Sequence, residues 1–208
     1  MPPTLSIVTR PFDWASLDRI DQASEAIVLS TAALGSFDER MLERLAERRA
    51  LAVAVADGAS LGGFALAAAL ACDWLALGAA VRLDLESDHA AASAAIIAGM
   101  TWRAPSAAFR LHVEGVTALN ADEARSLDLA DVIVPDGADP VQWAVDWIGG
   151  RSLVALNAGA SLIRRRGDDA LERAVFSLLF AAGEPRDGLR AFLEKRAARF
   201  ENRIAAFS

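Results

Sequence analysis

The 208-residue sequence is poor in the side chains that usually carry metal or redox chemistry, with one cysteine and two histidines. The single cysteine, Cys72, excludes an intrachain disulfide framework and a cysteine-rich zinc site. His89 and His112 are not spaced as a metal-ligand pair, so we expect no metal site. Cys72 lies in an apolar run, which predicts a buried, inert thiol. His112, between Leu111 and Val113, is interpreted as a partly buried core or interface residue.

Lysine is almost absent as well, because Lys195 is the only one and arginine supplies the other basic side chains. The formal net charge is −7, from 21 basic and 28 acidic residues. Phosphate binding relies on an excess of basic side chains, so this balance argues against nucleic acid as a partner. The arginine and alanine bias indicates a GC-rich bacterial genome.

Long hydrophobic runs are missing too. No apolar stretch reaches the roughly 18 residues of a spanning helix, since the run from Ala65 to Cys72 is stopped by Asp73. We therefore expect no membrane helix. The N-terminus, MPPTLSIVTRPFDW, lacks a basic start followed by an apolar core, so we expect no export signal and a cytoplasmic protein.

Short apolar runs alternate with helical patterns in the first half of the chain, which predicts an α/β protein with a largely parallel, buried sheet. Beyond Asp88 the pattern is mainly helical. The expected strands are Leu5–Val8, Ala26–Leu29, Leu51–Val55, Trp74–Leu77 and Val132–Val134. The expected helices are Ser16–Ser24, Phe37–Arg49, Ala65–Cys72, one from about His89, and then Val141–Ile148, Leu153–Arg165, Leu171–Ala182 and Arg186–Phe200. Trp143 and Trp147, one helical turn apart, predict a packed stripe.

The segment from Asp57 to Asp73, DGASLGGFALAAALACD, runs from a strand through a glycine-rich turn into a helix that ends in Cys-Asp. Without side chains, Gly62 and Gly63 let the first backbone N–H groups of that helix approach a ligand oxygen at the positive end of the helix dipole. Three more segments follow in order: GMTWR at 99–103, LNADEARSLDLADVIVP at 119–135 and DGLRAFLEKRAARF at 187–200. Together the four segments resemble the crotonase (enoyl-CoA hydratase/isomerase) superfamily, of which this chain is a short, divergent member.

The resemblance implies a ClpP/crotonase-like spiral of strand-strand-helix units over residues 1–139 and a helical oligomerisation region over 140–208. It implies an acyl-CoA thioester as ligand, with coenzyme A part of the substrate and no separate cofactor. Gly63 would be an oxyanion donor beside Gly62, Phe192 would line the adenine end, and Lys195 would meet the phosphates. The expected assembly is a homo-trimer or hexamer. For Phe192 and Lys195 the alternatives are helix core and a solvated charge.

The chain departs from the family at its two hydratase glutamates. The first falls at Ala67 or Leu66, where no carboxylate stands. The second falls in the window Glu86, Ser87, Asp88 and His89, where Glu86, Asp88 or His89 could act as a single acid or base. The alternative is that Ser87 and Asp88 cap the following helix.

The family's N-terminal loop, which supplies the second oxyanion donor, is not recognisable. Ala32, Ala33 or Gly35 would have to replace that donor. Two functions follow: a lyase or isomerase acting on an acyl-CoA, or a catalytically impaired accessory subunit of a partner enzyme of the same pathway. A third possibility is a scaffold that binds no ligand.

Overall fold

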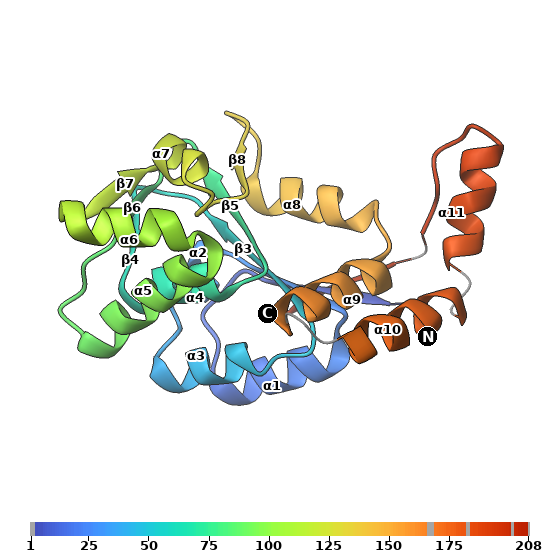
Figure 1. Cartoon of the computed structure of the whole chain (residues 1–208), viewed down its shortest axis with the longest axis horizontal. Helices are drawn as coiled ribbons and strands as arrows, with labels where there is room; N and C mark the ends of the chain where they lie inside the picture. The colour runs from blue at the N-terminus through green and yellow to red at the C-terminus, as the bar shows by residue number, and fades with distance from the viewer. Residues whose placement is uncertain (1–2, 166–168, 182–183, 201, 208) are drawn as a thin grey trace.

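A computed structural model describes residues 3–165, 169–181, 184–200 and 202–207, and its central feature is a six-stranded parallel sheet (Figure 1). The strand order is β8-β5-β3-β2-β1-β9, and every neighbouring pair is parallel. The strands are β1 (Thr4–Val8), β2 (Ala26–Leu29), β3 (Leu51–Ala56), β5 (Trp74–Gly78), β8 (Val132–Val134) and β9 (Arg203–Phe207). The five strands expected from the sequence are all present in this sheet.

A second, three-stranded sheet has the order β4-β6-β7, with β4 (Ser60–Gly62) parallel to β6 (Arg82–Asp84) and β7 (Ala118–Asn120) antiparallel. Two strand-strand-helix units contribute strands to both sheets. In each unit the first strand enters the large sheet and the second enters the small one: β3, β4 and α4 (Gly63–Ala71), then β5, β6 and α5 (Ala90–Arg103). The predicted spiral of such units is confirmed.

Alternate residues of the central strands face opposite sides, as the two-residue period of a strand requires. Ile27, Leu29 and Ala54 pack with α1, α3 and α4, whereas Val28 and Val55 pack with α8. Figure 1 shows α1 and α3 on one side of the sheet and α8 on the other. The remaining helices are α1 (Trp14–Ala23), α2 (Thr31–Leu34), α3 (Glu39–Ala46), α6 (Pro105–Glu114), α7 (Ala121–Ser126), α8 (Pro140–Gly149), α9 (Leu153–Arg164), α10 (Asp169–Ala181) and α11 (Glu184–Leu193).

The two tryptophans of α8 form the packed stripe that their spacing predicts. Trp74 of β5 stacks on both, with ring centroids 5.9 Å from Trp143 and 4.3 Å from Trp147. Cys72 is fully buried, as expected. Burial raises the pKa of the Cys72 thiol to about 12, so the thiol stays protonated and unreactive at neutral pH.

The last predicted helix, Arg186–Phe200, is wrong beyond Leu193, where α11 ends. Lys195 adopts a left-handed φ of 53°, and the N–H of Arg196 donates to the carbonyl of Ala191 at 3.0 Å, a common way to terminate a helix. The chain then forms β9, which pairs with β1 along its whole length. Because α8 packs on the large sheet and β9 joins it, residues on both sides of the predicted boundary at 139 share that sheet. The boundary stays a prediction.

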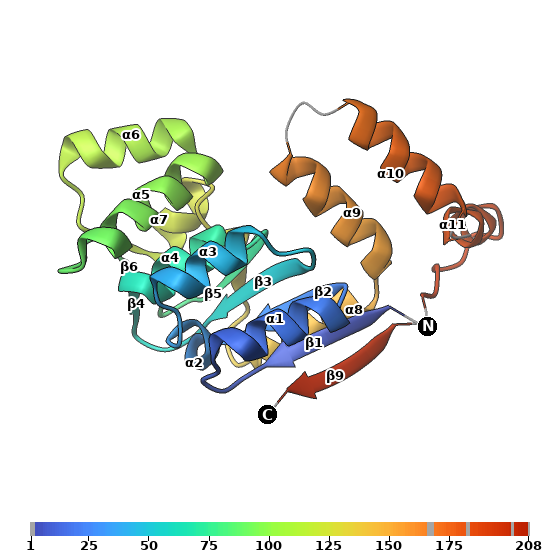
Figure 2. The ribbon, with the colours of Figure 1, turned by 90° about the horizontal axis from the view of Figure 1, so that it is seen from below.

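Helices α10 and α11 stand apart from the large sheet, at the opposite end of the molecule from α4, α5 and α6 (Figure 2). Six large apolar side chains on these two helices are more than half exposed: Phe176, Leu178, Phe180, Leu189, Phe192 and Leu193. We call them the C-terminal apolar face. Among the described residues, no helix has the length and apolar character needed to cross a membrane.

Candidate functional site

The glycine turn at the start of α4 has the geometry that its two glycines predict. Gly63 has a φ of +55°, the left-handed region that favours glycine. A Cβ at Gly62 would lie 3.2 Å from the Cβ of Asp84, so β4 and β6 approach closely there. No side chain caps the N-terminus of α4. Its first backbone N–H groups therefore carry the positive end of the helix dipole without a side-chain acceptor.

The window Glu86–His89 lies beside this turn. A Cβ built on Gly63 would be 3.8 Å from Ser87 Oγ, and the His89 ring packs on Phe64 with a centroid distance of 5.6 Å. The segment is held by two hydrogen bonds, from the N–H of His89 to Ser87 Oγ at 3.2 Å and from Ser93 Oγ to the Ser87 carbonyl at 2.9 Å. The structure thus places Gly62, Gly63, Ser87 and His89 next to one another.

The alternative role for this window, an N-cap of α5 by Ser87 or Asp88, is wrong. Helix α5 begins at Ala90, its N-cap residue is His89, and no side chain makes a capping hydrogen bond there. Ser87 instead bonds within its own turn, as described above. Glu86 and Asp88 are both exposed to solvent.

A cavity of about 520 Å³ opens between this window, α5 and α6. Glu86, Ser87 and Asp88 line it together with His112. The interpretation of His112 as a core residue is wrong, since it is exposed in the single chain, and the alternative of an interface residue stays a prediction. Its neighbour Leu111 takes the buried position of α6 and His112 is left at the edge of the cavity. Only the helical register of α6 against α5 reveals this, so the sequence alone gave no signal for it.

The carboxyl ends of β2 and β3 meet at the same edge of the large sheet. The Thr31 hydroxyl accepts the N–H of Asp57 at 2.8 Å and also bonds the Asp57 carboxylate. Of the three N–H groups considered as a second oxyanion donor, that of Ala33 donates to Ser30 Oγ at 3.4 Å and that of Gly35 to the Thr31 carbonyl at 3.0 Å. Ala32 is the remaining candidate.

Both positions at which the first hydratase glutamate could fall are in the core. Leu66 is 0 % exposed and Ala67 is 1 % exposed. They belong to a run of five buried residues in α4, Leu66–Leu70. A carboxylate at either position would need a buried partner, which is costly to provide. The packing of α4 is therefore that of a core helix at these positions.

The C-terminal end of α4 is held by hydrogen bonds and ion pairs from neighbouring side chains. Arg103, at the end of α5, donates to the carbonyls of Leu70 at 3.0 Å and Cys72 at 2.7 Å, and pairs with Asp131 at 2.9 Å. Asp73 pairs with Arg164 at 2.7 Å and accepts the N–H of Ala52 at 2.8 Å. The conspicuous polar residues of these motifs thus hold helices and strands together.

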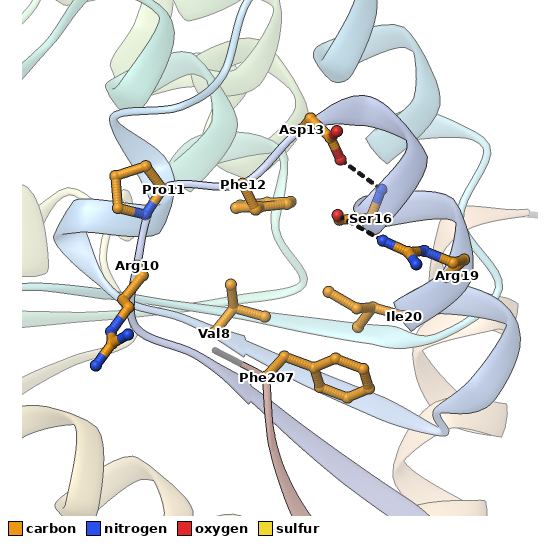
Figure 3. A pocket seen from close by; sticks show the side chains of 9 residues that line it. All are labelled: Val8, Arg10, Pro11, Phe12, Asp13, Ser16, Arg19, Ile20 and Phe207. Atoms are coloured by element: carbon orange, nitrogen blue, oxygen red, sulfur yellow. Dashed lines mark hydrogen bonds between the residues drawn. The ribbon is translucent and has the colours of Figure 1, made fainter.

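A larger cavity, of about 710 Å³, lies at the carboxyl end of β1 between α1 and β9 (Figure 3). Phe12 and Phe207 line it with two arginines, Arg10 and Arg19. Asp13 is the N-cap of α1, and hydrogen bonds from Ser16, through its side chain and its backbone N–H, lower the pKa of the Asp13 carboxyl. The cavity combines apolar walls with two cations, at the sheet edge where parallel α/β proteins usually bind ligands.

Phe192 and Lys195 are not near the glycine turn within one chain. Both are exposed, Phe192 at 78 %. Phe192 belongs to α11 and Lys195 follows the end of that helix by two residues, and α11 lies at the opposite end of the molecule from α4 (Figure 2). The alternative reading of Phe192 as helix core is wrong for the single chain. Among the described residues, no three histidine, cysteine or carboxylate side chains are grouped closely enough to bind a metal.

No protein-family model and no curated protein matches this sequence. Solved structures do match its fold. An enoyl-CoA hydratase subunit I from Geobacillus kaustophilus superposes with a TM-score of 0.70 at 20 % identity, over 90 % of this chain and 85 % of that one. Pseudomonas aeruginosa DspI gives 0.65 at 23 % identity, over 92 % and 88 %. An enoyl-CoA hydratase/isomerase from Marinobacter aquaeolei gives 0.65 at 17 % identity, over 88 % and 85 %. The chain therefore has the crotonase fold of the enoyl-CoA hydratase/isomerase structures.

Proposed function

We propose that this protein is a crotonase-family member that binds an acyl-CoA thioester, with the thioester oxygen at the start of α4. The observation that carries the proposal is the uncapped N-terminus of α4 at Gly63, with the Glu86–His89 window directly beside it. Backbone N–H groups aimed at a developing enolate oxygen stabilise it strongly in a site that excludes water. The fold of the neighbouring structures supports the same ligand class.

The chemistry that fits these residues is proton transfer by one acid-base group. In a double-bond isomerisation, Glu86 or Asp88 removes a proton from the carbon next to the thioester. The resulting dienolate is held at the Gly63 N–H, and the same group returns the proton at the far end of the former double bond. One proton leaves and one returns, so no second glutamate is needed. Water addition uses two such groups, and the buried Leu66 and Ala67 supply none.

The nucleotide end of coenzyme A would occupy the cavity of Figure 3, where Arg10 and Arg19 offer cations for phosphates and Phe12 a ring for stacking. Lys195 and Phe192 reach such a ligand only from another copy of the chain. The C-terminal apolar face supports assembly into a trimer or hexamer, because monomeric proteins rarely expose large contiguous apolar patches. A cytoplasmic location is part of the proposal.

Calorimetric titration with coenzyme A and short acyl-CoAs tests ligand binding. Turnover of a 3-enoyl-CoA to its 2-enoyl isomer tests the chemistry. We expect Glu86→Gln or Asp88→Asn to lower the turnover by about 10²–10⁴-fold. Asp136→Asn, an exposed carboxylate in the turn after β8, is the matched control and should leave it unchanged. Unaltered turnover in both window variants would show that the base is assigned wrongly.

Sedimentation of the wild-type chain and of Phe180→Asp tests the assembly. Phe180 belongs to the C-terminal apolar face, is 54 % exposed, and its ring centroid lies 4.7 Å from that of Phe176. The wild type should sediment as a trimer or hexamer, and the variant as a monomer with unchanged circular dichroism. A monomeric wild type would contradict the proposed assembly.

The second candidate function is that of an accessory subunit without catalysis of its own. The specific observation in its favour is that Ala33 and Gly35 use their N–H groups locally, which leaves only Ala32 to complete the oxyanion hole. This function predicts coenzyme A binding without turnover and co-purification with a partner enzyme of the same pathway. No binding at millimolar ligand would favour a scaffold and contradict both functions.

A further inference from the structure

Strand β9 is the outermost strand of the large sheet, and one of its two edges is uncovered. Its only partner among the described strands is β1, and Figure 2 shows β9 at the outer border of the sheet. Three of its five residues are exposed, including Ile204 at 54 %. A free edge of this kind presents backbone N–H and C=O groups that can pair with another strand.

The hydrogen bonds to β1 determine which backbone groups of β9 face the free edge. The N–H of Arg203 donates to the Pro3 carbonyl at 2.8 Å, so the backbone groups of Arg203 face β1. Successive residues of a strand direct these groups to alternate edges, so every second residue after Arg203 faces β1 as well. Ile204 and Ala206 therefore present their N–H and C=O groups to the free edge.

The strand lacks the features that usually block a free edge. Proteins protect such edges with lysine, proline, a bulge, or a helix or loop that covers the strand. The strand sequence RIAAF contains neither lysine nor proline, and its pairing with β1 runs through all five residues without a bulge. Of the described elements, only β1 contacts β9 extensively. The edge is therefore open to a further strand.

We infer that β9 pairs antiparallel with β9 of a second copy and so joins two of the proposed trimers into a hexamer. The inference rests on the proposed assembly and makes no use of the acyl-CoA site. Ile204 of each copy lies opposite Ala206 of the other, and each such pair exchanges both of its N–H···O=C bonds. A register shifted by one residue would bring outward-facing groups against residues that face β1, so it would form no ladder.

The side chains of the strand fit this register. Arg203 of one copy lies opposite Phe207 of the other, which places a guanidinium beside an aromatic ring and keeps the two Arg203 side chains apart. Ala205, a small residue, lies opposite itself on the twofold axis. The complementarity of charge and size therefore favours a second copy of the same strand as the partner.

The pairing also brings a residue of the second copy to a cavity. Phe207 lines the cavity of Figure 3, which is proposed for the nucleotide end of coenzyme A. Arg203 of the second copy, opposite Phe207, would add a cation at the border of that cavity. Arg10 and Arg19 are the cations that one chain supplies there.

The contact is small, because each copy contributes five residues. Two trimers joined in this way share one such contact for each pair of chains, and linked contacts bind more tightly than one alone. We therefore expect the pairing to hold trimers together but not two isolated monomers.

Sedimentation of Ala206→Pro tests the pairing. A proline at this position removes an outward N–H and leaves the bonds to β1 in place, which an edge strand tolerates. The wild type should sediment as a hexamer, and Ala206→Pro as a trimer with unchanged circular dichroism. Ile204→Lys, which adds a charge to the edge, should also give a trimer. Val113→Lys is the matched control, an exposed branched residue of α6, and should stay hexameric.

Oxidation of cysteine variants tests the register. Ala205→Cys would lie opposite itself in a non-hydrogen-bonded pair, whose Cα atoms are about 4.5 Å apart, within the range of a disulfide. Ala206→Cys would lie opposite Ile204 and is the matched control. Cys72 is buried and should not react. We expect Ala205→Cys to form a disulfide-linked dimer about 10-fold faster than Ala206→Cys, because only its geometry fits the bond.

The outcomes separate this contact from the rest of the assembly. A trimeric wild type would overturn the inference and leave the C-terminal apolar face as the trimer contact. A monomeric wild type would overturn both. A hexameric Ala206→Pro, or equal rates of disulfide formation in the two cysteine variants, would show that β9 does not join the trimers.

Discussion

The two ends of helix α4 come from one continuous segment of sequence and have opposite characters. At the C-terminal end, Arg103 bonds two carbonyls and pairs with Asp131, and its side chain is only 4 % exposed. At the N-terminal end, Gly63 adopts a left-handed conformation, no side chain caps the helix, and the neighbouring carboxylates are exposed. At the C-terminal end, which we call the saturated end, the backbone carbonyls accept side-chain hydrogen bonds. At the N-terminal end, which we call the open end, the backbone N–H groups have no side-chain acceptor. The motif residues at the C-terminal end therefore serve the fold, and those at the N-terminal end are the ones that we propose for ligand binding.

The largest effect should come from breaking the saturated end. We expect Arg103→Leu to lower the free energy of unfolding by about 3–5 kcal/mol, because it removes two charge-assisted hydrogen bonds and leaves two carbonyls unpaired. Urea denaturation measures this. Arg125→Leu is the matched control, since Arg125 pairs with Asp128 at 3.5 Å with both side chains exposed, and it should cost less than about 1 kcal/mol. Equal costs would remove the contrast between the two ends.

At the open end, we expect Gly63→Ala to lower the free energy of unfolding less than Arg103→Leu does, and to lower turnover strongly. The left-handed φ costs an alanine about 1–2 kcal/mol. The new Cβ would lie 3.8 Å from Ser87 Oγ, in the space proposed for the thioester oxygen. We expect about a 10²-fold loss of isomerase turnover, comparable to removal of one oxyanion donor.

Gly137→Ala separates strain from function. Gly137 has a φ of +79°, and a Cβ there would meet nothing within 4 Å. The Gly137→Ala variant should lose about as much free energy of unfolding as Gly63→Ala, while its turnover stays at the wild-type level. If Gly137→Ala lost turnover as well, the effect at Gly63 would be one of general stability and the open end of α4 would have no special role.

The contrast also explains which features could be predicted from the sequence. The five expected strands and the glycine turn were identified because short apolar runs and a Gly-Gly pair are local signals. Strands β4, β6 and β7 have three residues each, too few to show a two-residue period. Strand β9 was missed because its residues are exposed or half-buried and its pairing is with β1, at the other end of the chain.

Sites built from separate helices were harder to predict. The family resemblance pointed to Gly63 and the Glu86–His89 window. In the structure Gly63, Ser87 and His89 lie next to one another, and the roles of the site residues stay predictions. The position of His112 at the cavity edge has no signature in the sequence. It depends on how α6 packs against α5, which no local sequence pattern reports.

The smallest expected effect is a pH dependence at the saturated end, carried by Cys72. Its pKa is raised by burial from 9.0 to about 12, so the folded protein keeps a proton that the unfolded chain loses above pH 9. Stability must therefore fall as the pH rises from 9 toward 12, by about 1.4 kcal/mol per pH unit at most. The sequence makes this measurable, because it has no tyrosine and only one lysine to titrate in the same range. Urea denaturation between pH 8 and 10.5 should show the slope in the wild type. Cys72→Ala should abolish most of it, and a slope that persists in Cys72→Ala would assign the proton to another group.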